Sequence, residues 1–527
     1  MKKLFRICMR GALLMALPLM LIGCEDILGK WERPTPAVPS VTKTAGTISY
    51  ASTTMLRGSL DPAFSNALTQ VGNGSITYQS SDPSVATVDA TTGKVTPVAV
   101  GTVTIKAIVS DSETYTYASK EASYTIELQD GYSYRFWNTT SNQFETAIKP
   151  SSECELITSS TTTFSGKRYI AIGNLTIDHD IDITGVSGIT LCDNAELTIN
   201  GRLHGNKDLL IFAQSEGDEV GKLNVTTNTG TDGDGVIDLS TDLTDLAIHG
   251  GKIVVTATGN TTQLYGIKCA NLNIYGGDIK AQGNESSASI GSHGIYRGYY
   301  SGVIGIHGGR VVAIGGNSTG GTNRAGDGIC GKYVIDGTAI VIATGGNAIG
   351  VNKSGGYGID ANSFGGSIGG SAQVTAQGGN GVGGGCAMHL QGDVTIQENA
   401  VVTATGGDNI GTDSKGGSGS NNGTLTLKDQ ASFTARGGKS SGNADGQDAM
   451  WNFLDYYGGT FTAIGGAKGP SGANDGKAVR SSYYIQNQTS DIITLEYSDD
   501  GQTWGGTFDI NASTSSTPTY HAVRKMN

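Results

Sequence analysis

Proline and charged residues are the two scarce components of this 527-residue chain. It has 10 prolines against 81 glycines, and Asp, Glu, Lys and Arg together make up only 16% of it. The absence of a Gly-X-Y period excludes collagen, and a hydrophobic content of 37% argues against wholesale disorder. The formal net charge of -12 disfavours nucleic acid as a partner, because phosphate neutralisation needs a basic patch. A chain of this length exceeds one ordinary core, so we expect two or more domains.

Cysteine is also sparse, and no Cys-x-x-Cys occurs. Cys8 and Cys24 belong to the N-terminal segment, which leaves an odd number at wide spacings: Cys154, Cys192, Cys269, Cys330 and Cys386. This pattern indicates neither a disulfide framework nor a zinc site. Because free cysteine behaves as a small buried hydrophobe, we expect most of these thiols to stack inside the fold.

The one long apolar run lies at the N-terminus, where four basic residues precede it. It is too short to span a membrane, so residues 1–23 are predicted to be a signal peptide. Its end, Leu21-Ile22-Gly23-Cys24, resembles the lipobox of bacterial lipoproteins. That resemblance implies a lipid anchor on Cys24; an ordinary secretory signal is the alternative. The following Glu25-Asp26 is similar to a surface-export signal, which implies a surface-exposed outer-membrane protein.

Residues 24–40 are proline-rich and are expected to form a stiff tether. Residues 41–130 then alternate apolar and polar side chains between turn signals, which predicts a β-sandwich. This segment resembles the bacterial Ig-like domain (group 2), and the resemblance implies a spacer or adhesive module without catalytic residues. It rests on Tyr78, Ser80, Ser81, Asp82, Val85, Ala86, Val88, Asp89, Gly93, Val95, Gly101 and Val103.

An internal repeat dominates the rest of the chain. The pattern β-branched-or-Phe, any, Ala, any, Gly occurs eight times, with alanines at 257, 281, 313, 343, 376, 404, 435 and 463. Such short strands cannot stand alone, and stacked copies of 24 to 33 residues predict a solenoid. We therefore expect an all-β chain, with the Ig-like sandwich followed by a right-handed parallel β-helix over 131–480. About eight repeats start from 246, and residues 481–527 form a β-hairpin cap. A β-propeller is the structural rival.

The stretch from Val303 to Asn317, VIGIHGGRVVAIGGN, could be a phosphate cradle or scaffold. A dinucleotide fingerprint needs a strand, a glycine-rich turn and a helix, and nothing here indicates a helix. As one of eight copies, it is interpreted as scaffold: Gly308-Gly309 is a corner, Val311 and Ala313 face the interior, and Gly315-Gly316 releases the chain into a loop.

Calcium is the one metal that the residues suggest. The segment GTDGDGVID offers Asp232, Asp234 and Asp238, although both terminal carboxylates of an EF-hand loop are missing. We expect these three residues to be either calcium ligands between coils or solvated turn residues.

Carbohydrate is the ligand that the aromatic residues suggest. The loop HGIYRGYYSG makes Tyr296, Arg297, Tyr299 and Tyr300 the candidate contacts. No repeat carries a dense charged cluster, so no catalytic residue is assigned. His249 and His307 abut Gly-Gly corners and are expected to be exposed.

The repeat region resembles secreted parallel β-helix domains that bind carbohydrate and are related in fold to pectate lyases. The resemblance lies in the repeated sequence pattern I-x-G-G-x-V-x-A-x-G-G. It implies that the partner is an acidic plant or host polysaccharide and that calcium is bound. We therefore expect a lipid-anchored surface protein that binds polysaccharide without cleaving it. An adhesin or stalk without sugar specificity, and a β-helix polysaccharide lyase, are the alternatives.

Overall fold

The computed structural model describes residues 42–239, 244–287, 291–298, 302–320, 324–350, 353–412, 414–480, 485–510 and 520–525. The signal peptide, Cys24 and the tether lie outside these residues. None of the described helices is long and apolar enough to span a membrane. The described chain is almost entirely strand, as the alternating patterns predict, with one short 3-10 helix at Ser151–Glu153.

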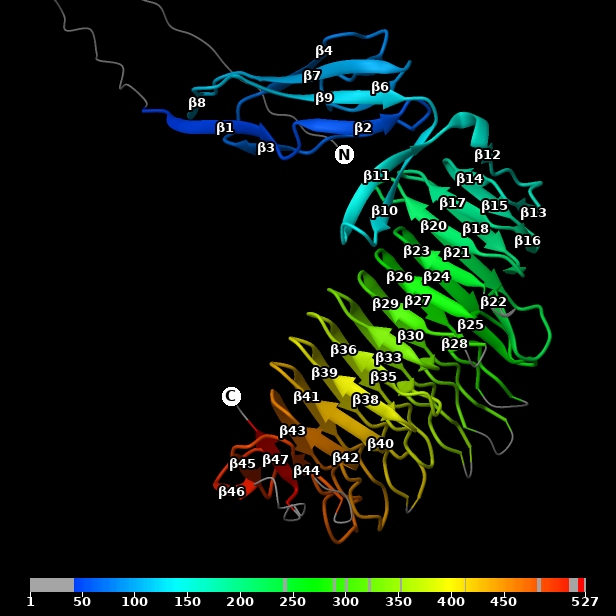
Figure 1. Cartoon of the computed structure of the whole chain (residues 1–527), viewed down its shortest axis with the longest axis vertical. Helices are drawn as coiled ribbons and strands as arrows, with labels where there is room; N and C mark the ends of the chain where they lie inside the picture. Colours follow the sequence, from blue (N-terminus) through cyan, green and yellow to red (C-terminus); the bar gives the residue numbers. More distant parts are fainter. Residues whose placement is uncertain are drawn as a thin grey trace, which may run out of the picture.

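The first unit is a β-sandwich, drawn in blue in Figure 1. Its larger sheet has the order β2-β9-β7-β4, and a second sheet has the order β3-β1-β8. The bounds are β1 (Thr44–Tyr50), β2 (Thr54–Gly58), β3 (Leu68–Val71), β4 (Ile76–Ser80), β7 (Gly101–Val109), β8 (Tyr115–Tyr117) and β9 (Glu121–Gln129). Strand β7 buries Val103, Ile105 and Ala107 on one side, as its alternation predicts.

The second unit is a parallel β-solenoid that forms a long arc away from the sandwich (Figure 1). Each coil gives one strand to a 14-stranded sheet and two to a 24-stranded sheet. One representative coil consists of β24 (Lys252–Ala257), β25 (Leu264–Cys269) and β26 (Asn271–Ile274), and the next consists of β27 (Asp278–Gln282), β28 (Ile295–Arg297) and β29 (Ile304–Ile306). Every strand of the first coil pairs in parallel with its counterpart.

The interior of the solenoid is an apolar core of Ile, Leu, Val and Ala side chains. The repeated alanines stack in register from Ala281 through Ala313 and Ala343 to Ala463. The first copy differs from the sequence-based alignment, because Val255, and not Ala257, lies opposite Ala281. Strand β24 continues further than its successors, which moves the alanine of that copy two residues beyond the ladder.

The far end of the solenoid is closed by antiparallel strands. Strand β47 (Ala522–Lys525) pairs with β43 (Thr460–Ile464), the last parallel strand of the 14-stranded sheet. Strands β45 (Ile493–Ser498) and β46 (Gly506–Ile510) extend the sheet beyond β47. Pairing of this kind covers the edge that an open solenoid would leave exposed.

The Gly-Gly corners predicted from the sequence are present. Gly277 and Gly309 have φ angles of 99° and 73°, which side chains other than glycine rarely adopt. Behind the second corner, Val311 and Ala313 are fully buried, as predicted.

The chain enters a loop after the glycines that follow each alanine, as predicted for Gly315-Gly316, and these glycines also bond to the neighbouring coil. They form a glycine seam, a zigzag of main-chain hydrogen bonds in which a glycine leaving one coil alternates with a glycine returning to it. The glycine seam consists of Gly316, Gly326, Gly346, Gly356, Gly379, Gly385, Gly407, Gly417, Gly438, Gly466 and Gly476. A Cβ atom at any of these positions would lie 1.7–2.1 Å from a main-chain oxygen. Close packing of coil against coil therefore explains why these positions are glycine.

Buried polar groups join the sandwich to the first coils. The Arg57 guanidinium lies 3.4 Å from the Asp193 carboxylate, and both side chains are almost fully buried. Asp61 accepts hydrogen bonds from the Ser133 hydroxyl at 2.5 Å and from the Gln214 amide at 2.6 Å. Asp193 and Gln214 belong to the solenoid, so the sandwich is fixed to it by specific contacts.

Candidate polysaccharide-binding groove

One position of the 24-stranded sheet carries a polar, ionisable or aromatic side chain on each of ten successive coils. We call it the polar row. Its members lie opposite one another on successive coils: Asp182, His204, Asp238, Lys268, Tyr296, Cys330, Asp360, His389, Asn421 and Trp451. Neighbouring parallel strands are about 4.8 Å apart, so the polar row offers one functional group per coil at that spacing.

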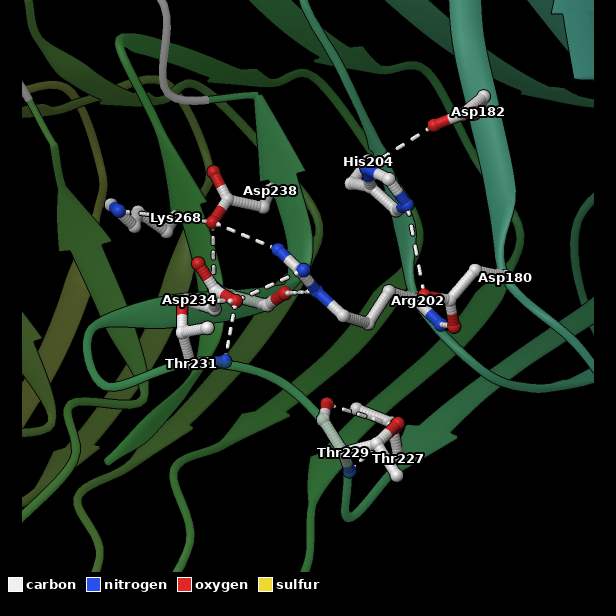
Figure 2. Close-up of polar contacts among 11 residues, drawn as sticks. Asp180, Asp182, Arg202, His204, Thr227, Thr229, Thr231, Asp234, Asp238 and Lys268 are labelled. Atoms are coloured by element: carbon white, nitrogen blue, oxygen red, sulfur yellow. Dashed lines mark hydrogen bonds and ion pairs between the residues drawn. The ribbon is translucent and has the colours of Figure 1, made fainter. Parts of the chain in front are cut away.

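Arg202 organises the N-terminal part of the polar row (Figure 2). It lies just before β19 (Leu203–Gly205), and its side chain extends toward the next coil. One terminal nitrogen lies 3.0 Å from Asp234 Oδ2 and the other 3.4 Å from Asp238 Oδ2. Its Nε donates to the carbonyl of Gly235 at 3.1 Å. All parts of this guanidinium are therefore bound by the protein.

His204 and Lys268 flank the Arg202 cluster. Figure 2 shows His204 between two carboxylates, with Nδ1 3.3 Å from Asp182 Oδ1 and Nε2 3.7 Å from Asp180 Oδ2. Lys268 Nζ lies 3.7 Å from Asp238 Oδ2, a looser contact than those of Arg202. Both side chains are partly exposed and can therefore contact a ligand.

A shallow cavity of about 420 Å³ lies over this cluster. Its lining includes Asp182, Arg202, His204, Asp234 and Asp238. Asp180 and Lys268 stand beside it, so four carboxylates face two permanent cations. The groove therefore has an excess of negative charge.

The structure separates the three predicted calcium ligands. Asp234 and Asp238 share Arg202, whereas Asp232 Oδ1 accepts a hydrogen bond from the main-chain N–H of Gln263 at 2.8 Å. Among the described residues, they belong to no group of three or more side chains with donor atoms within 4.8 Å of one another. Calcium binding by these residues stays a prediction.

The four predicted carbohydrate contacts also have different environments. Tyr296 is a half-buried member of the polar row and packs on the rings of Tyr265 and His293. Arg297 is only 4% exposed, with NH1 donating to the carbonyl of Gly302 and the guanidinium over the Phe364 ring. A ligand contact by Arg297 stays a prediction. Tyr299 and Tyr300 lie outside the described residues.

A second row of rings lies beside the Gly-Gly corners. Phe212, His249, Tyr275 and His307 stack on successive coils, with ring centroids 4.8–5.2 Å apart. The expectation that His249 is exposed is wrong: its Nδ1 accepts a hydrogen bond from the main-chain N–H of Trp137, on β10 (Tyr132–Asn138). Burial, followed by the charge of Arg168, lowers the pKa of His249 to about 4.

Another cavity, of about 580 Å³, lies at the corners beside this row of rings. Its lining includes the corner residues Gly251, Gly277 and Gly309, as well as Lys222 and Lys252. Lys222 already contacts Glu196 at 3.7 Å, and no aromatic side chain lines the cavity. The cavity over the polar row offers the denser set of polar groups.

Comparison with known families identifies the first unit. Residues 43–118 match the bacterial Ig-like domain (group 2), in agreement with the resemblance carried by residues 78–103. No curated protein and no solved structure matches the chain. The combination of a bacterial Ig-like domain and a parallel β-solenoid indicates a surface or adhesin-like protein.

Proposed function

We propose that the solenoid binds a polysaccharide along the polar row, with the chain of sugars parallel to the solenoid axis. The observation that carries this proposal is the alignment of Asp182, His204, Asp238, Lys268 and Tyr296 on five successive coils. A linear polymer lying across the coils meets a new side chain at each step of about 4.8 Å. Globular ligands would contact only part of such a row.

The side chains of the groove suit recognition of hydroxyl groups. Carboxylates accept hydrogen bonds and Lys268 donates them, while the Tyr296 ring offers an apolar surface to a sugar face. Arg202 holds Asp234 and Asp238 in place, so little side-chain entropy is lost when a ligand binds. Fixed polar groups of this kind favour binding of a defined polymer.

The charge of the groove bears on which polymer binds. With four carboxylates against Arg202 and Lys268, a neutral or amino-sugar polymer is favoured over an acidic one. An acidic polymer would need a cation between its carboxylates and those of the protein, and calcium accepts such oxygen ligands. We therefore propose calcium-dependent binding only for acidic polymers.

The remaining parts of the proposal concern location. We propose that Cys24 carries the lipid anchor and that the chain is displayed on the outer membrane. The buried contacts of Arg57 and Asp61 hold the Ig-like sandwich against the solenoid. These contacts fix the orientation of the solenoid relative to the Ig-like sandwich.

Affinity electrophoresis of the full chain in gels containing cellulose derivatives, chitosan, pectin or host glycans tests the proposal. Lys268→Met should weaken binding to the retained polymer by about ten- to a hundredfold, because it removes a hydrogen-bonding charge worth about 1.5–3 kcal/mol. Lys280→Met is the matched control, since Lys280 is exposed on the other sheet. Absence of retardation on every polymer would overturn the proposal and favour an adhesin or stalk without sugar specificity.

A polysaccharide lyase remains the enzymatic alternative, since Arg202 and Lys268 stand beside carboxylates. We propose binding without cleavage, because the Arg202 guanidinium is fully engaged by protein oxygens. Incubation of the chain with pectin and other uronate polymers, with and without calcium, tests this. A rise in ultraviolet absorbance from unsaturated sugar ends would overturn it.

A further inference from the structure

A cluster of ionisable groups, most of them buried, lies at the middle of the polar row. It includes His293, Arg324, Asp327, Cys330 and Asp360, all on neighbouring coils. Neither the polysaccharide proposal nor the core packing uses these groups. Cys269 belongs to the apolar core of the solenoid, as expected for a buried thiol, but Cys330 does not. Cys330 instead occupies the polar row between Tyr296 and Asp360.

We propose that His293, Asp327 and Cys330 bind a divalent transition metal ion of the zinc type. Their nitrogen, oxygen and sulfur donor atoms all lie within 4.8 Å of one another, and no other group of described residues meets this condition with three such side chains. His293 Nδ1 is 3.3 Å from Asp327 Oδ2. This proposal goes beyond polysaccharide binding and does not depend on it.

The positions of the three side chains are fixed by the fold. The His293 ring packs against the rings of Tyr265 and Tyr296, at centroid distances of 5.2 Å to each, and those two rings also contact each other. Asp327 is held by Arg324, whose two terminal nitrogens lie 2.8 and 3.1 Å from the two carboxylate oxygens. Oδ1 also accepts the main-chain N–H of Tyr357 at 2.7 Å, whereas Oδ2 keeps a second lone pair that can bind a metal. Ligands held in this way lose little freedom on binding.

The charge of the cluster favours a divalent cation. Asp327 and Asp360 carry two negative charges in their ionised forms, against one permanent positive charge on Arg324. With Cys330 as a thiolate, a divalent ion brings the sum of these charges to zero.

The types of donor atom select the metal. A thiolate and an imidazole are preferred ligands of zinc and related transition metals, whereas calcium and magnesium prefer oxygen. Binding breaks the Cys330 S–H bond and releases that proton to solvent, and the sulfur lone pair forms the metal bond. The His293 Nδ1 lone pair, which accepts the main-chain N–H of Asp327 at 3.0 Å, is transferred from that hydrogen bond to the metal.

Metal content of the full chain tests the proposal. Because the cluster is buried, the protein is produced in zinc-supplemented medium, dialysed against a weak chelator and measured by elemental analysis. We expect one tightly held zinc per chain, lost in Cys330→Ser and in His293→Gln. Cys386→Ser is the matched control, since Cys386 is also buried but its sulfur accepts a hydrogen bond from Asn421.

Production in cobalt-supplemented medium gives a second readout. Cobalt bound by a thiolate has a ligand-to-metal charge-transfer absorption that oxygen and nitrogen ligands do not give. We expect this absorption in the unsubstituted chain and in Cys386→Ser, and its loss in Cys330→Ser. Circular dichroism establishes that each variant is folded. Absence of zinc from the folded unsubstituted chain, or an unchanged charge-transfer absorption in folded Cys330→Ser, would overturn the proposal.

Discussion

Replacing Gly407 with alanine tests whether the glycine seam holds the coils together. A Cβ atom at this position would lie 1.9 Å from the carbonyl oxygen of Gly379, where real Cβ contacts are not shorter than 3.0 Å. The two coils must therefore separate locally. Gly407 donates to the carbonyl of Gly385 at 2.8 Å and accepts from the N–H of Gly417 at 2.7 Å, so separation weakens both hydrogen bonds.

The expected loss of stability combines three effects. Overpacking of a close-packed site costs about 1–3 kcal/mol. Each of the two weakened hydrogen bonds contributes about 1 kcal/mol. Alanine also restricts the unfolded chain, which offsets about 0.5–1 kcal/mol of this loss. We therefore expect Gly407→Ala to reduce the free energy of unfolding by about 2–4 kcal/mol.

Hydrogen–deuterium exchange is the appropriate assay, because stacked repeats can open locally before the whole chain unfolds. Gly407→Ala should accelerate exchange in the seam of the coils on either side of residue 407. Gly505→Ala is the control, since a Cβ there meets nothing within 4 Å. Equal exchange and equal unfolding free energies in the two variants would refute the view that close glycine packing stabilises the solenoid.

Three further predictions concern other parts of the fold. His249 binds a proton more weakly in the folded chain than in the unfolded chain, where its pKa is near 6.5. The free energy of unfolding is therefore highest above pH 6.5 and falls as the pH approaches 4. We expect this loss to be about 2–3 kcal/mol and to be absent in His249→Gln when unfolding is compared at pH 7 and pH 4.5; an equal loss in both proteins would contradict it. Arg57→Met leaves the buried carboxylates of Asp61 and Asp193 without their cation and should lower the free energy of unfolding by about 3–5 kcal/mol in denaturant titrations. The control Lys106→Met removes an exposed ion pair and should change this free energy by less than about 1 kcal/mol. Gly309→Ala forces alanine to a φ of 73° and should lower the thermal midpoint through a cost of about 1–2 kcal/mol; an unchanged midpoint would show that the corner can relax.

Local sequence patterns were sufficient to predict the strands and corners of the solenoid, because each coil repeats the same short pattern of apolar residues and glycines. Alternation predicts which side of a strand is buried, as for Val311 and Ala313, and paired glycines predict the corners. The alignment failed at Ala257, where the sequence pattern is intact but the strand register places Val255 in the ladder. Register depends on contacts with the neighbouring coil, which one copy of a repeat does not reveal.

The candidate sites were harder to predict, because their residues come together through coils of unequal length. Asp238 and Lys268 become neighbours because the intervening 29 residues form one coil, and no local motif connects them. His249 is buried by a hairpin more than one hundred residues earlier in the chain. The wide spacing of His293, Asp327 and Cys330 likewise differs from that of a local zinc motif. A register-aware alignment of coils would have placed Asp238, Lys268, Tyr296 and Cys330 in one column.

Structural and variable residues occupy different positions of the same coil. At the glycines of the seam a Cβ would lie 1.7–2.1 Å from a main-chain oxygen, and only two coils place another residue there, Ser292 and Gln447. The interior is filled by apolar side chains. The polar row, in contrast, holds acidic, basic, aromatic, thiol and amide side chains on one continuous ladder. Because side chains of the polar row do not belong to the apolar core, a coil can carry a different side chain at this position while the core packing of its neighbours stays the same. The specific chemistry of this chain is therefore expected along that ladder, and the densely repeated glycines hold its successive coils in close contact.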